Sequence, residues 1–126
     1  MSILIVEEEK AVTDLLSEQL REHGFHVRTA GDGEEALQMM REQRPKLVIL
    51  EVILPKKDGF EVLEEMKEDE ELKEIAVFFL TYLAHEEDVS RGLATGAADY
   101  LVDKSPAGIA ELVGKVKRFF TSSSTP

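Results

Sequence analysis

Short apolar segments recur along the chain, and each is followed by a stretch with the periodicity of a helix. We predict five strands from these segments, at 2–6, 25–29, 47–50, 75–80 and 98–102. The runs at 47–50 and 75–80 contain no polar residue, which is typical of parallel strands covered on both faces. In 25–29 the side chains alternate in character, which indicates a strand near an edge of the sheet.

The stretches between these strands place apolar residues three and four positions apart, which is the spacing of one helix face. One helix is predicted over 86–95, with Val89 and Leu93 facing inward and Gly96 ending it. Pro106 suits the first turn of the last helix, where its missing N–H is not needed. Strands that alternate with helices imply a parallel sheet with helices on both faces, joined by right-handed crossovers.

The length of 126 residues suits one domain with a substantial hydrophobic core. The hydrophobic share of 43% and the charged share of 33% are typical of a globular chain rather than a disordered one. We predict an α/β domain over residues 1–120. Polar residues 121–126 are expected to be a linker stub or a frayed end.

The formal net charge of −11 argues against nucleic acid or an anionic membrane as a partner, because both would repel the chain. The chain has no cysteine, which excludes disulfides and thiolate chemistry, and His23, His26 and His85 share no metal-ligand spacing. No apolar run reaches the roughly 18 residues that span a bilayer. Residues 1–4 lack the basic start of a signal peptide, so we expect a cytoplasmic protein.

Polar side chains follow four of the predicted strands, at the edge of the sheet where ligands bind in such folds. They are Glu7, Glu8, Glu51, Thr81 and Lys104 or its neighbour. Three converging carboxylates repel one another unless a cation joins them or one takes up a proton. Carboxylate oxygens with waters suit Mg²⁺, and a hydroxyl and an ammonium suit a phosphoryl group. The pattern predicts phosphoryl handling on a carboxylate, without a GxxxxGK[ST] phosphate loop.

Four segments each combine a strand end with a particular polar or aromatic residue: 3–9 with Glu7 and Glu8, 47–59 with Glu51, 80–81 with Thr81, and 92–101 with Tyr100. Together they resemble the receiver domains of two-component response regulators over nearly the whole chain. The resemblance implies a flavodoxin-like fold with sheet order 2-1-3-4-5. It also implies Mg²⁺ held by the acids, a phosphoacceptor at Glu51, and a switch made by Thr81 and Tyr100.

The chain departs from the family pattern at the phosphoacceptor, which is an aspartate in the family and Glu51 here. One extra methylene moves the carboxylate outward by about 1.5 Å. In-line phosphoryl transfer depends on placement, so we expect no stable phosphorylation of Glu51. The same shift brings a negative charge nearer to the phosphoryl position, with one charge against roughly −1.5 to −2. We therefore expect Tyr100 to point inward and Thr81 to be drawn towards Glu51.

Further departures surround this position. The acidic pair consists of two glutamates, which predicts weak Mg²⁺ binding or none, because that ion demands near-ideal octahedral geometry. Tyr82 stands where the family usually carries a small residue, and its ring either covers the site or has no role.

The family's lysine lies three residues after the switch aromatic, and in this chain that position is Asp103. Lys104 comes one residue later, and the proline that usually follows is displaced to Pro106. In a regular strand this shift turns Lys104 to the other face. Only a bulge or an early strand end would return it to the site.

These features predict a receiver-like module, not an enzyme beyond Mg²⁺-dependent self-phosphorylation, that contacts a protein partner through its fourth helix, fifth strand and fifth helix. The partner would be a kinase, an output domain or a second protomer. The alternative is a working phosphoacceptor that takes phosphate from a histidine kinase with Mg²⁺. An unrelated flavodoxin-like binding module is disfavoured, because no aromatic-rich or Gly-rich ligand loop follows the strands.

Overall fold

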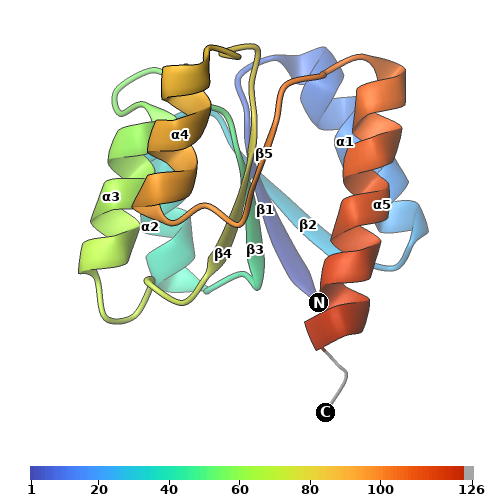
Figure 1. Cartoon of the computed structure of the whole chain (residues 1–126). Helices are drawn as coiled ribbons and strands as arrows, with labels where there is room; N and C mark the ends of the chain where they lie inside the picture. Colours follow the sequence, from blue (N-terminus) through green and yellow to red (C-terminus); the bar gives the residue numbers. More distant parts are fainter. Residues whose placement is uncertain (124–126) are drawn as a thin grey trace.

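A five-stranded parallel sheet forms the centre of the molecule in the computed structural model, which describes residues 1–123 (Figure 1). The strands lie in the order β2-β1-β3-β4-β5, so the predicted α/β fold and sheet order are confirmed. Their bounds are β1 Ser2–Val6, β2 His26–Ala30, β3 Leu47–Leu50, β4 Ala76–Leu80 and β5 Asp99–Leu101. The strand β2 lies at one edge of the sheet, as its alternating pattern indicates.

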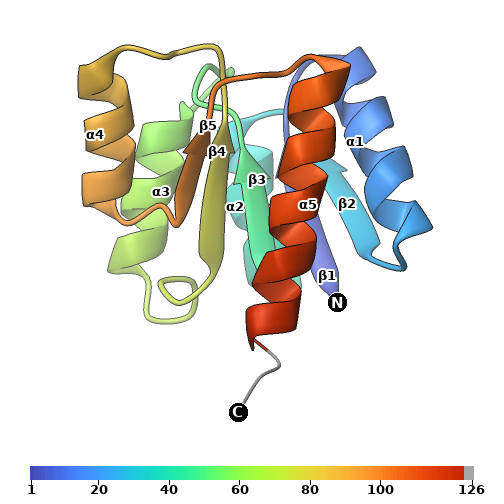
Figure 2. The same cartoon turned by 45° about the vertical axis from the view of Figure 1, so that its right-hand side comes forward.

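Helices cover both faces of the sheet, with α1 and α5 on one face and α2, α3 and α4 on the other (Figures 1 and 2). The helices are α1 Lys10–Glu22, α2 Gly33–Glu42, α3 Gly59–Glu68, α4 Glu86–Thr95 and α5 Pro106–Ser123. Residues 121–123 of the expected polar tail therefore continue α5, and residues 124–126 lie outside the described part of the chain. Within residues 1–123, no helix combines the length and hydropathy needed to cross a membrane.

The central strands are buried on both sides because each face of the sheet packs against a separate layer of helices. Successive side chains of a strand point to opposite faces. In β1, Leu4 packs into the cluster under α2 and α3, whereas Ile3 and Ile5 pack into the cluster under α1 and α5. This two-sided burial explains the unbroken apolar runs in the sequence.

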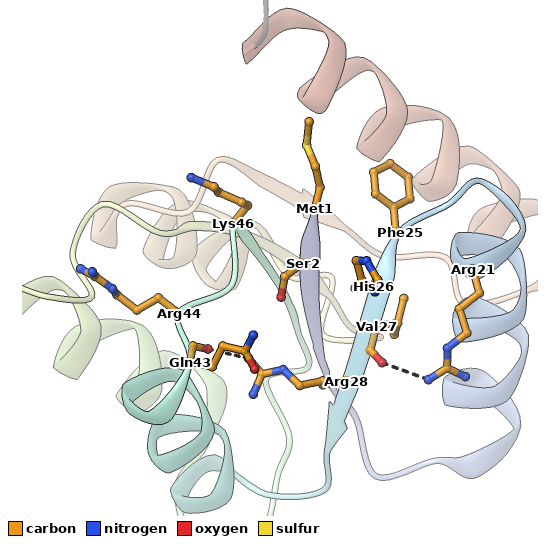
Figure 3. Close-up of a pocket in the computed structure, with 10 residues that line it drawn as sticks. All are labelled: Met1, Ser2, Arg21, Phe25, His26, Val27, Arg28, Gln43, Arg44 and Lys46. Carbon is orange, nitrogen blue, oxygen red and sulfur yellow. Dashed lines mark hydrogen bonds between the residues drawn. The ribbon is translucent and has the colours of Figure 1, made fainter.

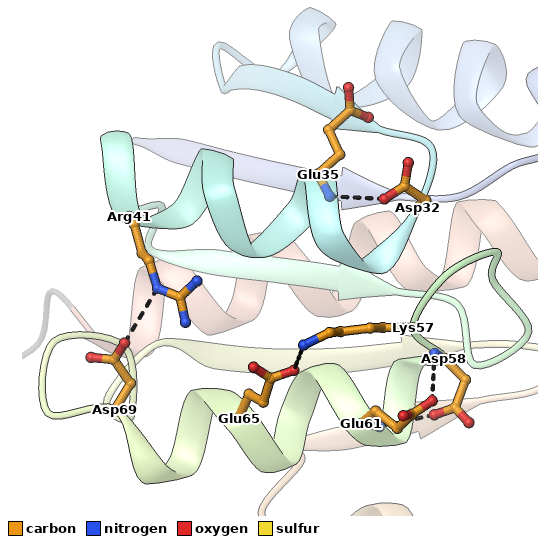
Figure 4. Close-up of polar contacts among 8 residues, drawn as sticks. All are labelled: Asp32, Glu35, Arg41, Lys57, Asp58, Glu61, Glu65 and Asp69. Carbon is orange, nitrogen blue, oxygen red and sulfur yellow. Dashed lines mark hydrogen bonds and ion pairs between the residues drawn. The ribbon is translucent and has the colours of Figure 1, made fainter.

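Carboxylates fix the first turns of α2 and α3 at the carboxyl edge of the sheet (Figure 4). Asp32 accepts a hydrogen bond from the backbone N–H of Glu35 at 2.8 Å. Asp58 and Glu61 form a capping box, in which each side chain accepts the other residue's backbone N–H, at 2.9 and 3.1 Å. These caps hold the loops that follow β2 and β3 in defined positions.

The prediction that Leu93 faces inward is wrong. Leu93 is 46% exposed, Val89 is half-buried, and Gly92 is the buried residue of α4. A Cβ at position 92 would lie 2.9 Å from the Tyr100 ring and 3.2 Å from the Phe79 ring. The helix therefore approaches the sheet through its glycine, and this rotation turns Leu93 outward.

This burial pattern predicts unequal costs for two leucine truncations. We expect Leu63→Ala, in the fully buried core, to lower the free energy of unfolding by about 2–5 kcal/mol. Leu93→Ala removes exposed surface and is expected to change it by no more than about 0.5 kcal/mol. Urea denaturation of both variants measures the difference, and a comparable loss in Leu93→Ala would contradict the orientation of α4.

Candidate functional site

Lys104 joins two carboxylates at the carboxyl edge of the sheet. Its Nζ lies 2.7 Å from Oε1 of Glu7, and it also donates a hydrogen bond to Oε1 of Glu51. Glu7 follows β1, Glu51 follows β3 and Lys104 lies between β5 and α5, so three separate elements meet here. All three residues are buried, with exposed fractions of 7%, 5% and 5%.

Lys104 reaches the site because β5 ends early, at Leu101. The alternation of side chains holds only within a strand, so it no longer governs a residue three positions beyond it. The preceding Asp103, at the position of the family's lysine, turns away and accepts a hydrogen bond from the backbone N–H of Ser105 at 2.8 Å. Hydrogen bonds from Ser105 lower the pKa of Asp103. Asp103 thus stabilises the turn into α5 and leaves the site to Lys104.

The backbone holds the second oxygen of the Glu51 carboxylate. Oε2 accepts hydrogen bonds from the N–H groups of Val52 and Ile53, at 2.6 and 3.2 Å. Gly59 closes this loop by donating its N–H to the carbonyl of Val52 at 2.7 Å. A Cβ on Gly59 would lie 2.3 Å from the carbonyl oxygen of Glu51, so the close approach requires glycine. Both oxygens of Glu51 therefore have partners within the chain.

The expected magnesium set of Glu7, Glu8 and Glu51 is not assembled. Glu8 is exposed, and the second oxygen of Glu7 accepts the backbone N–H of Glu9 at 3.0 Å. Among the residues that the structure describes, no group of three or more acidic or histidine side chains could hold a metal ion. In this arrangement the ammonium of Lys104 supplies the positive charge that the two buried acids need.

The buried site stabilises the charged form of Lys104. Burial opposes that form, but the hydrogen bonds to Glu51 and Glu7 and their negative charges outweigh it, so the pKa of Lys104 is raised. The ring of Tyr82, which is 61% exposed, lies above the ammonium with its centroid 5.0 Å from Nζ. Of the two roles considered for Tyr82, this contact favours a ring that covers the site.

Thr81 does not make the expected contact with Glu51. Thr81 is fully buried, and among the hydrogen bonds of residues 1–123 its Oγ1 accepts the N–H of Leu83 at 3.2 Å. The carbonyl of the same Leu83 accepts the hydroxyl of Tyr100 at 2.6 Å. The backbone of Leu83 thus links the two residues proposed as a switch. The sequence gives no signal for this link, because any residue type supplies a backbone N–H and carbonyl.

Tyr100 points inward, as expected, but other contacts hold it there. Its ring packs 5.4 Å from the Phe79 ring and against Gly92. Burial raises the pKa of the Tyr100 hydroxyl to about 12, and the charges of Asp88 and Glu51 add to the effect. The inward position therefore depends on α4 and on Leu83 rather than on Thr81 being drawn towards Glu51.

An α/β sheet of this order, with acids after β1 and β3 and a lysine after β5, defines a receiver-type signalling domain. Residues 3–117 match the family described as response regulator receiver domain, and the chain belongs to that family.

Curated relatives include the DNA-binding dual master transcriptional regulator RpaA of Synechocystis, 35% identical over 115 residues that make up 91% of this chain and 47% of RpaA. The alkaline phosphatase synthesis transcriptional regulatory protein PhoP of Bacillus subtilis is 36% identical over 121 residues, 96% of this chain and 49% of PhoP. The chain spans about half the length of these relatives.

Solved structures match over nearly their full lengths. The Mn²⁺-bound form of response regulator Rcp1 has a TM-score of 0.86 and 31% identity, covering 98% of this chain and 96% of that chain. The phosphorylated cyanobacterial phytochrome response regulator RcpA has a TM-score of 0.88 and 32% identity, with the same coverage. Receiver domains of response regulators are signalling modules rather than typical enzymes.

Because the ammonium of Lys104 bonds both Glu7 and Glu51, we expect that replacing Lys104 strongly destabilises the fold. Lys104→Met leaves two buried carboxylates without a cation, so we expect the free energy of unfolding to fall by about 3–5 kcal/mol. Adding Glu7→Gln and Glu51→Gln to that variant should recover part of the loss, because the uncompensated charges are gone. Chemical denaturation at neutral pH measures both effects. Exposed Glu8→Gln is the control, and a loss in Lys104→Met no larger than in Glu8→Gln would contradict the role of the ion pairs.

The contact between α4 and Tyr100 predicts that Gly92→Ala displaces the ring. The added Cβ would lie 2.9 Å from Cδ2 of Tyr100, too close for the ring to stay in place. The chain has no tryptophan and two tyrosines, so Tyr82→Phe leaves Tyr100 as the main fluorophore. In that background, Gly92→Ala should increase the quenching of Tyr100 fluorescence by acrylamide. Leu93→Ala is the control on the same helix, and equal quenching in both would show that Gly92 does not hold the ring.

Proposed function

We propose that this receiver domain signals without phosphorylation at Glu51 and acts as a protein-interaction module. The observation that carries the proposal is the complete engagement of the Glu51 carboxylate. One oxygen is bonded to Lys104 and the other to two backbone N–H groups. An attacking carboxylate oxygen must approach phosphorus closely and in line. Oε2 already accepts two hydrogen bonds, and Oε1 would have to attack from beside the ammonium of Lys104.

The surroundings of Glu51 support the same proposal. Phosphoryl transfer in such sites relies on a divalent cation to neutralise charge, and the acids near Glu51 do not form a set that fits one. The inward Tyr100 contacts Phe79, Gly92 and the carbonyl of Leu83. These contacts within the fold favour the inward arrangement of the switch residues.

The interaction surface that we propose consists of α4, β5 and α5. The strand β5 is the edge of the sheet, and Leu93 of α4 exposes its side chain beside it. Lys115 of α5 forms an ion pair with Asp99 of β5 at 2.9 Å, which ties the two elements together. A kinase, an output domain or a second protomer would contact this surface. The curated relatives are transcriptional regulators, and DNA binding is not proposed for the receiver domain itself.

Working phosphorylation at Glu51 is the alternative, and the position of Lys104 favours it. The ammonium reaches the site, although the sequence register left this open. A lysine there could neutralise a phosphoryl group as well as a carboxylate. The alternative requires Oε1 of Glu51 to attack phosphorus beside Lys104 and a metal ion to bind with fewer acids than expected.

Treatment with a phosphodonor distinguishes signalling without phosphorylation from phosphorylation at Glu51. We expect the unmodified chain, incubated with acetyl phosphate and Mg²⁺, to show no mass gain of one phosphoryl group by intact mass spectrometry. Glu51→Asp draws the carboxylate back by about 1.5 Å, and we expect its phosphorylation to be at least about 10²-fold faster. Glu51→Gln is the matched control without an acceptor. A phosphoryl mass gain in the unmodified chain that disappears in Glu51→Gln would overturn the proposal.

A further inference from the structure

An open pocket of about 700 Å³ lies at the edge of the sheet opposite to the site formed by Glu7, Glu51 and Lys104. It is formed where β1 and β2 begin and where the loop after α2 leads into β3 (Figure 3). The residues that line it include no acid, and its charged or titratable members are Arg21, His26, Arg28, Arg44 and Lys46. A basic lining is unexpected in a chain of net charge −11.

The positive charges of this pocket are not neutralised by ion pairs. Eight of the fifteen lysines and arginines pair with acids, namely Lys10, Arg41, Lys56, Lys57, Lys73, Arg91, Lys104 and Lys115. Within residues 1–123, none of the four pocket cations has such a partner. The acids Glu71 and Glu74 lie beside Arg44 and Lys46 in a neighbouring hollow, but form no ion pair with them. Arg21 likewise shares a hollow with Asp14, Glu18 and Glu22 without forming an ion pair. Within the described residues, the pocket therefore gathers cations that form no ion pairs, while acids lie around its rim.

Backbone carbonyls orient the three arginines without using up their donors. Arg21 donates to the carbonyl of Val27 at 3.0 Å, and Arg28 donates to that of Gln43 at 2.5 Å (Figure 3). Arg44 donates to the carbonyl of Glu71 at 3.3 Å. A guanidinium carries five N–H donors, so most remain available. Such fixed, partly free guanidinium groups are suited to bidentate binding of phosphate oxygens.

The N–H groups of Arg28 differ in how accessible they are. Its Nε is buried and has no hydrogen-bond partner within the described residues, and solvent does not reach it. An anion in the pocket would therefore meet the outer N–H groups of this guanidinium.

The helix ends explain only part of this arrangement. The carboxyl ends of α1 and α2 point towards this edge, and cations near such ends are favourable. Arg21 lies in the last turn of α1 and fits that explanation. Arg28 lies on β2, and Lys46 lies beyond the end of α2, where its backbone N–H binds the carbonyl of Ser2 at 2.9 Å. The end of a helix does not account for either residue.

We propose that this pocket binds a small anion of nucleotide size that carries at least two phosphate groups. Its volume falls within the roughly 300–1,000 Å³ of small-molecule sites. Arg28 and Arg21 lie on opposite sides of β2 in Figure 3, so an anion that contacts both must extend across the start of this strand and carry charge at both ends. Phe25 and Met1 add an apolar wall for a base or similar ring. A long nucleic acid is disfavoured, because the acidic remainder of the chain would repel it.

Binding is tested with the full chain by calorimetry at constant ionic strength, using pyrophosphate, adenosine diphosphate, inorganic phosphate and sulfate as separate probes. We expect saturable binding of pyrophosphate and adenosine diphosphate, and at least about tenfold weaker binding of phosphate and sulfate. Tighter binding of adenosine diphosphate than of pyrophosphate would assign a contact to the base. Equal affinities would assign recognition to the phosphates alone.

Substitutions of the pocket arginines test whether the anion binds in this pocket. Arg28→Gln and Arg44→Gln should each weaken pyrophosphate binding by about tenfold or more. Arg44 is an exposed loop residue, so its variant keeps the test valid if Arg28→Gln fails to fold. Arg118→Gln is the matched control, since Arg118 is also exposed, forms no ion pair among the described residues, and lies on α5. Equal weakening in Arg118→Gln, or no saturable binding of either diphosphate at millimolar concentration, would overturn the proposal.

Discussion

Two buried carboxylates at one edge of a parallel sheet need a cation, and this chain supplies it from its own Lys104. The ammonium lies between Glu7 and Glu51 and so ties the ends of β1 and β3 to the loop after β5. Such a buried arrangement is weak evidence for net stabilisation, because desolvation of the charges offsets their attraction. Breaking it is nevertheless costly, since a buried charge would then lack a partner. The ion pairs therefore fix where these loops lie, and the rest of the site is built around that geometry.

Backbone groups complete the site. The N–H groups of Val52 and Ile53 hold one oxygen of Glu51, and the backbone of Leu83 connects Thr81 with Tyr100. These contacts join groups of the protein chain itself. An input can shift a two-state element only by its different affinity for the two states. If contacts within the domain already favour the inward state of Tyr100, phosphorylation has less of a conformational shift left to cause.

The fold was predictable from the sequence because apolar runs, helical spacing and strand-end polarity all point to the same sheet. The wrong or undecided predictions concern residues where a rule of strand alternation or helical spacing no longer applies. Side-chain alternation could not place Lys104, because β5 ends three residues earlier. Helical spacing favoured Leu93 as an inward residue, but close packing of Gly92 on an aromatic ring turned the helix. Glu8 was grouped with Glu7 by adjacency, although neighbouring residues at a strand end point in different directions. Backbone contacts such as those of Leu83 cannot be predicted from residue type, because almost any residue could make them.

The two edges of the sheet differ in whether their cations form ion pairs with acids, and the net charge of the chain does not reveal this difference. At the carboxyl edge, Lys104 is fully buried between acids, so its charge is matched within the fold. At the amino edge, Arg28, Arg44 and Lys46 have no acid partner among the described residues, although acids outnumber bases in the chain by 26 to 15. Interactions between exposed charges fade over roughly 10 Å in ordinary salt, so most of the acids do little to neutralise these cations, and Glu71 and Glu74 are the ones that lie beside Arg44 and Lys46. The proposed protein-binding surface and the pocket meet at the end of α5, because Phe25, which lines the pocket, packs 5.0 Å from the Phe120 ring of that helix. The rest of the pocket is lined by α1, by the starts of β1 and β2, and by the loop after α2, and these elements lie outside the proposed protein-binding surface.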